Sequence, residues 1–241
     1  MFENLVVPQE LRPRDPRFGV GPSVVPVSHL ENLAATGQRL MGTSHRKDAV
    51  RSVVREFQEG LKAYFSLPDG YEVVIGNGGA TFLWDMIGLG LVEKSSSHFV
   101  CGEFSDKWHK AHQLIPWIST KVFKVENGEG IDPHDEDGVD FVCTTLNETS
   151  TGVQLRSVPK LKDPTALMSV DATSGAGQIP LDFNLVDVFY FSPQKIFAAD
   201  GGVYVAILSP KAIERALRIG SEKSRYVPEV MKWSHAIENS R

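Results

Sequence analysis

The sequence predicts an α/β fold with a mostly parallel seven-stranded sheet and helices on both of its faces. Seven short runs rich in Val, Phe and Ile are distributed along the 241 residues, and such runs are typical of buried strands. Segments with the apolar spacing of helices lie between the first few of these runs. Alternation of strand and helix is typical of a parallel sheet that is covered on both sides.

The elements follow in chain order. The segment 1–20 contains Pro8, Pro13 and Pro16 and is expected to form an extended N-terminal arm, with a large domain over 21–241. A helix before the first strand is indicated by apolar residues at helical spacing, namely Val50, Val53, Val54, Phe57 and Leu61. Residues 81–92 and 104–114 suit helices after the first two strands. The expected strands are 72–76, 98–102, 121–125, 139–145, 166–170, 186–192 and 203–208.

The composition excludes several classes of function. The chain is 41% hydrophobic and 23% charged, which is ordinary for a globular protein. Its net charge of -5 provides no basic field for a polyanion, so no nucleic acid partner is expected. The N-terminus "MFENLVVPQE" lacks a basic region followed by a long apolar one, and "FLWDMIGLGLV" is short and interrupted by Asp85. We therefore expect no membrane association and no export.

The two cysteines, Cys101 and Cys143, each fall inside an expected apolar strand. Buried thiols of this kind are typical of a reducing cytoplasm rather than of a disulfide framework. They lack the clustered spacing of a zinc site, so no metal is expected.

The stretch "GNGGATF" (76–82) ends the first expected strand and opens a helix. Glycines there allow the backbone to approach an anion, and a helix N-terminus offers free N–H groups with partial positive charge. A glycine-rich turn without a ligand is an equally good interpretation of this stretch alone. The G-x-G-x-x-G nucleotide pattern and a Walker lysine are both missing from it.

Two further strand ends carry charged side chains. "SVDATSG" (169–175) places Asp171 at the end of an apolar strand, where a carboxylate is either a turn former or a buried anion that needs a cation. "DVFYFSPQKIFAADGG" (187–202) sets Lys195 after another buried strand. A lysine there must reach water or be neutralised, or, if it is desolvated, it can condense with a carbonyl. Because carboxyl ends of parallel strands share one edge, we expect these groups to converge with the glycine-rich turn.

An anion cradle, an acid and a lysine in one crevice meet the requirements of pyridoxal 5'-phosphate. This cofactor needs a Schiff-base lysine, an acid that keeps its ring nitrogen protonated and an anchor for its phosphate.

The order of the glycine-rich turn, Asn147-Glu148-Thr149, Asp171 and "SPQK" resembles the phosphoserine aminotransferases. These are fold-type I members of the class V aminotransferases, and the likeness is greatest to their actinobacterial branch. It extends to "FGVGPSVVP" (18–26), "GTSHRK" (42–47) and "GEFSDKW" (102–108), and so covers essentially the whole chain.

The resemblance implies roles for individual residues. Lys195 matches the catalytic lysine that forms the Schiff base and shuttles the proton, and Asp171 matches the partner of the pyridine nitrogen. Phe104 matches the ring that stacks on the pyridine, and Thr149 the hydroxyl that bonds the phenolic oxygen. The residues that match the phosphate anchors are Ala80, Thr81, Thr173 and Gln194.

"SHR" permits two interpretations. Ser44 could cap the following helix, with His45 and Arg46 solvated in its first turn. Basic residues at that place oppose the helix dipole and favour an anion. The matching His and Arg of the family grip the phosphate of the substrate, often across a dimer interface, so the resemblance implies that His45 and Arg46 are substrate-binding residues and that the chain forms a homodimer.

The implied reaction transfers the amino group of glutamate to 3-phosphonooxypyruvate in two half-reactions, which gives 2-oxoglutarate and phosphoserine for serine and pyridoxine biosynthesis. Family members continue beyond the point where this sequence ends, into a loop that reaches the partner's cofactor and a small C-terminal domain. The resemblance thus implies a cofactor-binding large domain without the small one. Two alternatives stay open: another class V aminotransferase of the alanine or serine type, and an inactive fragment that only binds the cofactor or a partner subunit.

Overall fold

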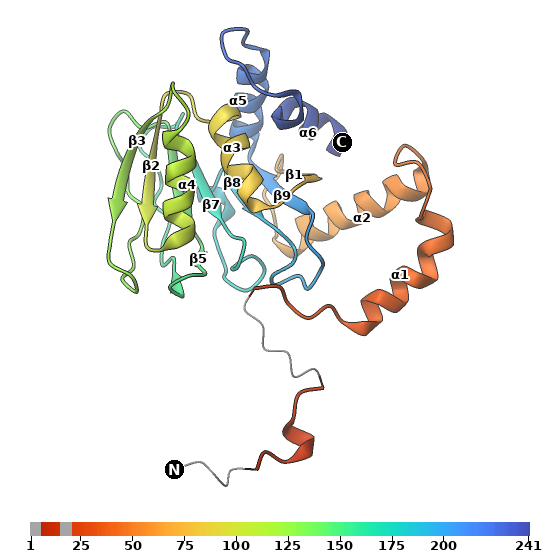
Figure 1. The fold of residues 1–241 in the computed structure, drawn as a ribbon. Coiled ribbons are helices and arrows are strands. Elements are labelled where there is room, and N and C mark those ends of the chain that lie inside the picture. Colours follow the sequence, from red (N-terminus) through yellow and green to blue (C-terminus); the bar gives the residue numbers. More distant parts are fainter. Residues whose placement is uncertain (1–5, 15–20) are drawn as a thin grey trace.

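All seven expected strands form one sheet in the computed structural model, which describes residues 6–14 and 21–241 (Figure 1). The strands are β1 (Glu72–Asn77), β2 (Ser95–Val100), β3 (Ser119–Lys124), β4 (Phe141–Thr145), β7 (Leu167–Asp171), β8 (Val188–Phe191) and β9 (Val203–Leu208). Their order across the sheet is β1-β9-β8-β7-β4-β2-β3. β9 is antiparallel to both of its neighbours, and the other pairs are parallel. The predicted mostly parallel seven-stranded sheet is confirmed.

The largest difference from the expected strands is at β2, which begins three residues before the predicted start at 98. Its first residues, Ser95, Ser96 and Ser97, are polar but buried, so the apolar pattern underestimates the strand. Cys101 consequently lies just beyond the strand rather than inside it, although it is still buried. A small two-stranded sheet of β5 (Asn147–Glu148) and β6 (Val153–Gln154) was not expected.

The three expected helices are present as α2 (Asp48–Tyr64), α3 (Ala80–Gly90) and α4 (Glu103–Gln113). Ser44 does not cap α2: its hydroxyl accepts from the Arg46 amide at 3.3 Å, and the helix begins only at Asp48. The described chain also contains α1 (Val27–Leu40), α5 (Pro210–Ser221), α6 (Trp233–Ser240) and the 3-10 helices η1 (Gln9–Leu11), η2 (Phe183–Leu185) and η3 (Glu229–Met231).

Each face of the sheet has its own apolar core. On one face, α3, α4, α5 and α6 cover the strands (Figure 1). Side chains such as Trp84, Trp108 and Trp233 form the core there. On the other face, the end of α2 at Leu61 and the segment around Phe183 cover the strands. Both faces are thus covered, although on the second face irregular chain replaces most of the helices.

α1 and α2 form a projection beside this sheet (Figure 1). In the expected N-terminal arm, residues 6–14 are exposed, whereas 1–5 and 15–20, including the start of the "FGVGPSVVP" motif, lie outside the described residues. None of the helices in the described ranges has both the length and the apolar character needed to cross a bilayer.

Candidate active site

The carboxyl ends of β1, β7 and β8 lie along the same edge of the sheet, because β9, which runs opposite to its neighbours, separates β1 from β8. This edge carries the glycine-rich turn after β1, Asp171 at the end of β7 and the Gln194–Lys195 segment after β8. The structure therefore brings together the three groups that the strand pattern placed at one crevice.

The glycine-rich turn has a backbone that side chains would disturb. A Cβ at Gly76 would lie 2.3 Å from the hydroxyl of Tyr204, and Gly78 has a φ of +119°, in the left-handed region. Gly79 is the N-cap of α3 and has no side chain to cap it, and none of the described side chains accepts a hydrogen bond from the first amides of this helix. A Cβ at Gly79 would lie 3.7 Å from Oγ of Ser192, so the turn lies beside the segment that leads to Lys195. These features suit an anion at the start of α3.

Asp171 is a buried carboxylate with four hydrogen-bond donors. Its Oδ1 accepts from the amide and the hydroxyl of Thr173, at 3.0 and 2.6 Å. Its Oδ2 accepts from Nε1 of Trp84 at 3.2 Å and from the hydroxyl of Tyr190 at 3.1 Å. All of these donors are neutral groups.

Burial raises the pKa of Asp171 above its usual value, and the hydrogen bonds from Thr173, Trp84 and Tyr190 oppose that rise only in part. A carboxylate in this situation gains from a cation or a protonated nitrogen placed next to it. Thr173, a predicted phosphate anchor, directs its hydroxyl at Asp171 in this structure.

The segment of Lys195 is held by residues that precede α1. The amide of Ser23 donates to the carbonyl oxygen of Gln194 at 2.8 Å, and the Ser23 hydroxyl donates to the carbonyl oxygen of Lys195. A Cβ at Gly21 would lie 3.9 Å from Nζ of Lys195, so the amine lies near the backbone of Gly21. Among the described residues, the buried Oε1 of the Gln194 side chain has no hydrogen-bond partner.

Thr149 and Phe104 lie along the same edge, in two separate hydrogen-bonded groups. The hydroxyl of Thr149 donates to Oγ of Ser174 at 2.7 Å, three residues after Asp171. The buried carboxylate of Glu148 accepts from the amides of Phe104 and Ser105 at 3.2 and 2.9 Å, and so caps the start of α4. Burial opposes ionisation of Glu148, but these bonds and those from the hydroxyls of Ser105 and Ser150 prevail and lower its pKa.

His45 and Arg46 do not meet the other predicted residues. Both are exposed and line a groove between α2 and α6, together with residues such as Arg51 and Glu238.

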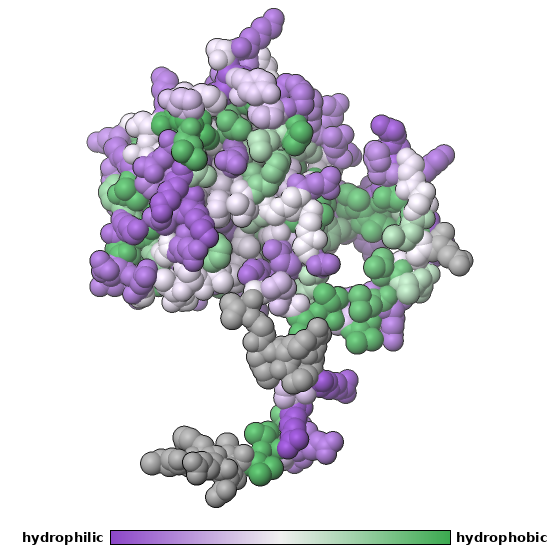
Figure 2. All heavy atoms as spheres, in the orientation of Figure 1, coloured by the Kyte–Doolittle hydropathy of each residue, from purple (hydrophilic) through white to green (hydrophobic). Residues whose placement is uncertain are grey.

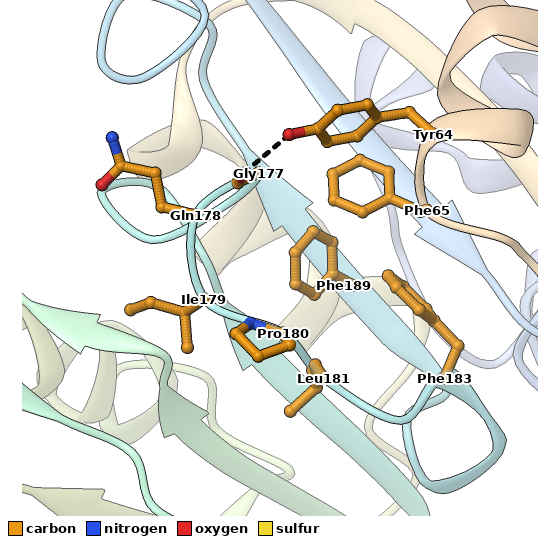
Figure 3. Close-up of a pocket in the computed structure, with 9 residues that line it drawn as sticks. All are labelled: Tyr64, Phe65, Gly177, Gln178, Ile179, Pro180, Leu181, Phe183 and Phe189. Carbon is orange, nitrogen blue, oxygen red and sulfur yellow. Dashed lines mark hydrogen bonds between the residues drawn. The ribbon is translucent and has the colours of Figure 1, made fainter.

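A separate hollow of about 280 Å³ lies on the second face of the sheet and is lined by Phe65, Phe183 and Phe189 (Figure 3). At this hollow the Tyr64 hydroxyl donates to the carbonyl oxygen of Gly177 at 2.7 Å. Neither hollow is lined by Asp171 or Lys195.

Residue spacing gave no indication of a buried cluster formed by His98, His112 and Cys143, whose potential ligand atoms lie within 4.8 Å of one another. Ser96 Oγ joins the two imidazoles, at 3.0 Å from Nε2 of His98 and 3.2 Å from Nδ1 of His112. Nε1 of Trp108 donates to His112 at 3.1 Å. The histidines thus already form a hydrogen-bonded part of the core.

The residues along the edge of the sheet fit pyridoxal 5'-phosphate. The first N–H groups of α3, which no described side chain caps, are available to a phosphate. Asp171 provides the carboxylate that a protonated pyridine nitrogen requires. Trp84, Tyr190 and Ser174 were missed as members of this site, because no local pattern relates them to Asp171 or Thr149.

Known proteins resemble the chain along its whole length. It is 47% identical to a phosphoserine aminotransferase of a Nocardioides species over all of its residues, which span 65% of that protein. A phosphoserine aminotransferase structure from Cytophaga hutchinsonii matches with a TM-score of 0.81 and 26% identity, covering 91% of this chain and 62% of the other. A PLP-bound phosphoserine aminotransferase from Trichomonas vaginalis matches with a TM-score of 0.74 and 21% identity, over 92% of this chain and 67% of the other.

The chain thus spans less than two thirds of the length of the curated relative from Nocardioides. Residues 116–236 match the sequence family described as aminotransferase class-V. This region includes Thr149, Asp171 and Lys195, and it extends over half of the chain. The chain belongs to the class V aminotransferase family.

Proposed function

We propose that the chain is the cofactor-binding part of a phosphoserine transaminase that holds pyridoxal 5'-phosphate at the carboxyl edge of its sheet. The observation that carries this proposal is the buried carboxylate of Asp171, which lies at the end of β7 on the edge that also carries the uncapped start of α3 and Lys195. The phosphoserine aminotransferase names of its relatives support the substrate class.

When bound, the cofactor supplies an electron sink for the charge that develops at the substrate Cα. The role of Asp171 is to hold the pyridine nitrogen in its protonated form. Lys195 binds the cofactor through its amine and moves the proton at the substrate Cα. Ala80, Thr81, Thr173 and Gln194 hold the phosphate, Phe104 covers the ring, and Thr149 donates to the phenolic oxygen.

The substrates we propose are glutamate with 3-phosphonooxypyruvate, and in the reverse direction phosphoserine with 2-oxoglutarate. His45 and Arg46 supply the cationic character that a phosphorylated substrate needs, and both are exposed before α2. They line a groove that does not include Lys195, which supports a role in the site of a neighbouring copy.

We propose a homodimer in which the projection of α1 and α2 is covered by a second copy. Figure 2 shows apolar surface along this projection. Its exposed apolar side chains are Val27, Leu30, Leu33, Val53, Val54 and Phe57. An apolar strip of this kind is costly in water and typical of an interface.

Sedimentation analysis should give a dimer for the chain, and Val54→Glu should shift it towards monomer. A wild-type monomer at micromolar concentration would contradict this part of the proposal.

The test of the proposed function is the visible absorption of the chain after mixing with pyridoxal 5'-phosphate, followed by glutamate. We expect a new band on mixing and its loss when glutamate is added. A band that glutamate does not change contradicts the transaminase and favours a chain that only binds the cofactor. A band that responds to alanine but not to glutamate contradicts the substrate assignment.

A further inference from the structure

The two oxygens of the Asp171 carboxylate are held in different ways. Oδ1 accepts from Thr173, which belongs to the turn that follows Asp171 directly. Oδ2 accepts from Trp84 on α3 and Tyr190 on β8, which are distant in the sequence. Only the second pair connects the carboxylate to the packing of the whole domain.

The donors to Oδ2 are fixed by burial. Tyr190 is 0% exposed and is the direct neighbour of Asp171 across the parallel pair of β7 and β8. Its ring packs edge-on against Trp108, with ring centroids 5.4 Å apart. A tyrosine held in this way has little freedom to turn its hydroxyl away from Asp171.

Trp84 is 6% exposed, and its indole N–H donates to Asp171. Its side chain belongs to the apolar core between α3 and the sheet, together with Trp108 and Tyr190. The position of α3 over the sheet therefore determines where this donor lies.

We propose that Trp84 and Tyr190 are positioning residues of the cofactor site, which fix Asp171 through Oδ2 and favour its ionised form. Hydrogen bonds donated to a carboxylate stabilise the charged state over the protonated one. The ionised form is the one that can hold a protonated pyridine nitrogen, and this step rests on the function proposed above.

The surroundings of Asp171 leave these donors as the principal stabilisers of its charge. Burial is the largest influence on its pKa, and the described groups that counteract it are Thr173, Trp84 and Tyr190. The titratable group that faces Asp171 from β8 is Tyr190 itself, and Cys143 lies on β4, which flanks β7 on its other side. Both have strongly raised pKa values because they are buried, so both are neutral when Asp171 titrates.

The first experiment needs no cofactor. The chain has four tryptophans, so a ¹H–¹⁵N spectrum shows four indole signals, which single Trp→Phe variants assign. The Trp84 signal should move in Asp171→Asn, while those of the distant Trp117 and Trp233 should not. Titration of the Trp84 signal with pH should report the protonation of Asp171. In Tyr190→Phe its midpoint should rise by roughly one pH unit, the effect of one lost hydrogen bond to a charged group.

Tyr204→Phe is the matched control, because Tyr204 is also buried on a neighbouring strand and its hydroxyl faces Gly76 rather than Asp171. It should leave the midpoint unchanged. The inference is overturned if the Trp84 indole signal has the same position in Asp171→Asn as in the wild type. It is also overturned if Tyr190→Phe does not raise the midpoint of the pH titration of that signal. Neither result depends on whether the chain binds pyridoxal 5'-phosphate.

The second experiment measures the affinity for pyridoxal 5'-phosphate as a function of pH. Trp84→Phe should weaken binding by roughly ten-fold or more near neutral pH and move the loss of binding in acid to higher pH. Trp233→Phe is the control, since its buried indole donates to the carbonyl oxygen of Met86, also on α3, at 2.9 Å. An equal loss of affinity at every pH in both variants would show a structural role only and would overturn the inference. Failure of the wild-type chain to bind the cofactor would instead contradict the proposed function.

Discussion

The backbone amide of Ser23 donates to the carbonyl oxygen of Gln194 at 2.8 Å, and thereby joins the segment before α1 to the loop that carries Lys195. The Ser23 hydroxyl adds a second bond, to the carbonyl oxygen of Lys195. Two chain segments more than 170 residues apart are thus held together beside the amine. The lysine loop owes part of its order to residues at the opposite end of the described chain.

Ser23→Ala should loosen the lysine loop. It removes one hydrogen bond of about 0.5–1.5 kcal/mol, so the amides of Ala198 and Ala199, which bond within the loop, should exchange with solvent up to about ten-fold faster. Hydrogen exchange of the free chain measures this. Ser28→Ala on the exposed face of α1 is the control and should change nothing. Equal exchange in Ser23→Ala and wild type would mean that the loop is ordered by its own packing.

Lys195→Ala should abolish covalent attachment of the cofactor. Borohydride treatment of the wild-type chain mixed with pyridoxal 5'-phosphate should fix one cofactor per chain, seen as a mass increase. The variant should show none, because the amine that condenses with the carbonyl is missing. Lys107→Ala is the control, since Lys107 lies near Phe104 at the same edge and pairs with Glu103. A fixed cofactor in Lys195→Ala would place the Schiff-base lysine elsewhere.

Asp171→Asn should bind the cofactor more weakly and, once loaded at high cofactor concentration, react slowly. Removing one partner of a buried charged pair costs about 3–5 kcal/mol, which in a transition state is two to three decades of rate or more. The rate at which glutamate changes the absorption of the bound cofactor measures the loss. Asp200→Asn, at an exposed position of the lysine loop, should react as the wild type does. Unchanged reaction in Asp171→Asn would exclude the ring nitrogen as its partner.

The sequence predicted the strands well because their burial leaves a local trace. Strands such as β4 and β8 are buried along their whole length and read as continuous apolar runs. The start of β2 was predicted three residues too late because its three buried serines resemble a loop. Ser96 is accommodated in the core by hydrogen bonds with His98 and His112, which depend on the fold. α5 also leaves a local trace, because its buried residues Ala212, Ile213, Ala216 and Ile219 stand at helical spacing.

Some residues of the candidate site could likewise be predicted from local sequence, and others could not. Asp171 and Lys195 were found because each follows a buried strand, so their position along the edge follows from the strand direction alone. Trp84 and Tyr190 contact Asp171 only through packing between α3, β7 and β8, which no local pattern records. Ser174 was quoted within a motif, but its bonds to Thr149 and Asn147 depend on the fold.

Gly76→Ala should destabilise the domain. The added Cβ would lie 2.3 Å from the Tyr204 hydroxyl, between the neighbouring strands β1 and β9, where both chains are held by the sheet. Overpacking of this kind costs about 1–3 kcal/mol, measured as the free energy of unfolding in urea. Gly60→Ala is the opposite control: it lies inside α2 with no atom within 4 Å of the new Cβ, and should stabilise by about 0.4–1 kcal/mol. Equal stability of the two variants would contradict the close approach of Tyr204 to β1.

Acid should destabilise the chain through the buried histidines. Burial lowers the pKa of His112 from 6.5 to about 3 and also lowers the pKa of His98 well below its usual value. The unfolded chain therefore binds more protons than the folded one below about pH 6.5. The contribution of these histidines to the free energy of unfolding is fully present above this pH and is lost as pH falls. The loss approaches about 1.4 kcal/mol per pH unit for each histidine.

Urea unfolding at pH 7, 6, 5 and 4.5 tests this, in the window where most carboxylates are still ionised. Asp171 changes the free energy of unfolding with pH in the opposite direction, because its raised pKa makes the folded chain take up a proton before the unfolded one. The contribution of His112 is therefore measured as the difference between the wild type and a His112 variant. His112→Gln should be less stable at pH 7, since it loses packing and bonds to Ser96 and Trp108, but its stability should depend less on pH than that of the wild type. The exposed His45→Gln should keep the wild-type slope. If the free energy of unfolding of His112→Gln depends on pH as steeply as that of the wild type, His112 takes up its proton in the folded chain as well. The description of His112 as a neutral, hydrogen-bonded core residue would then be wrong.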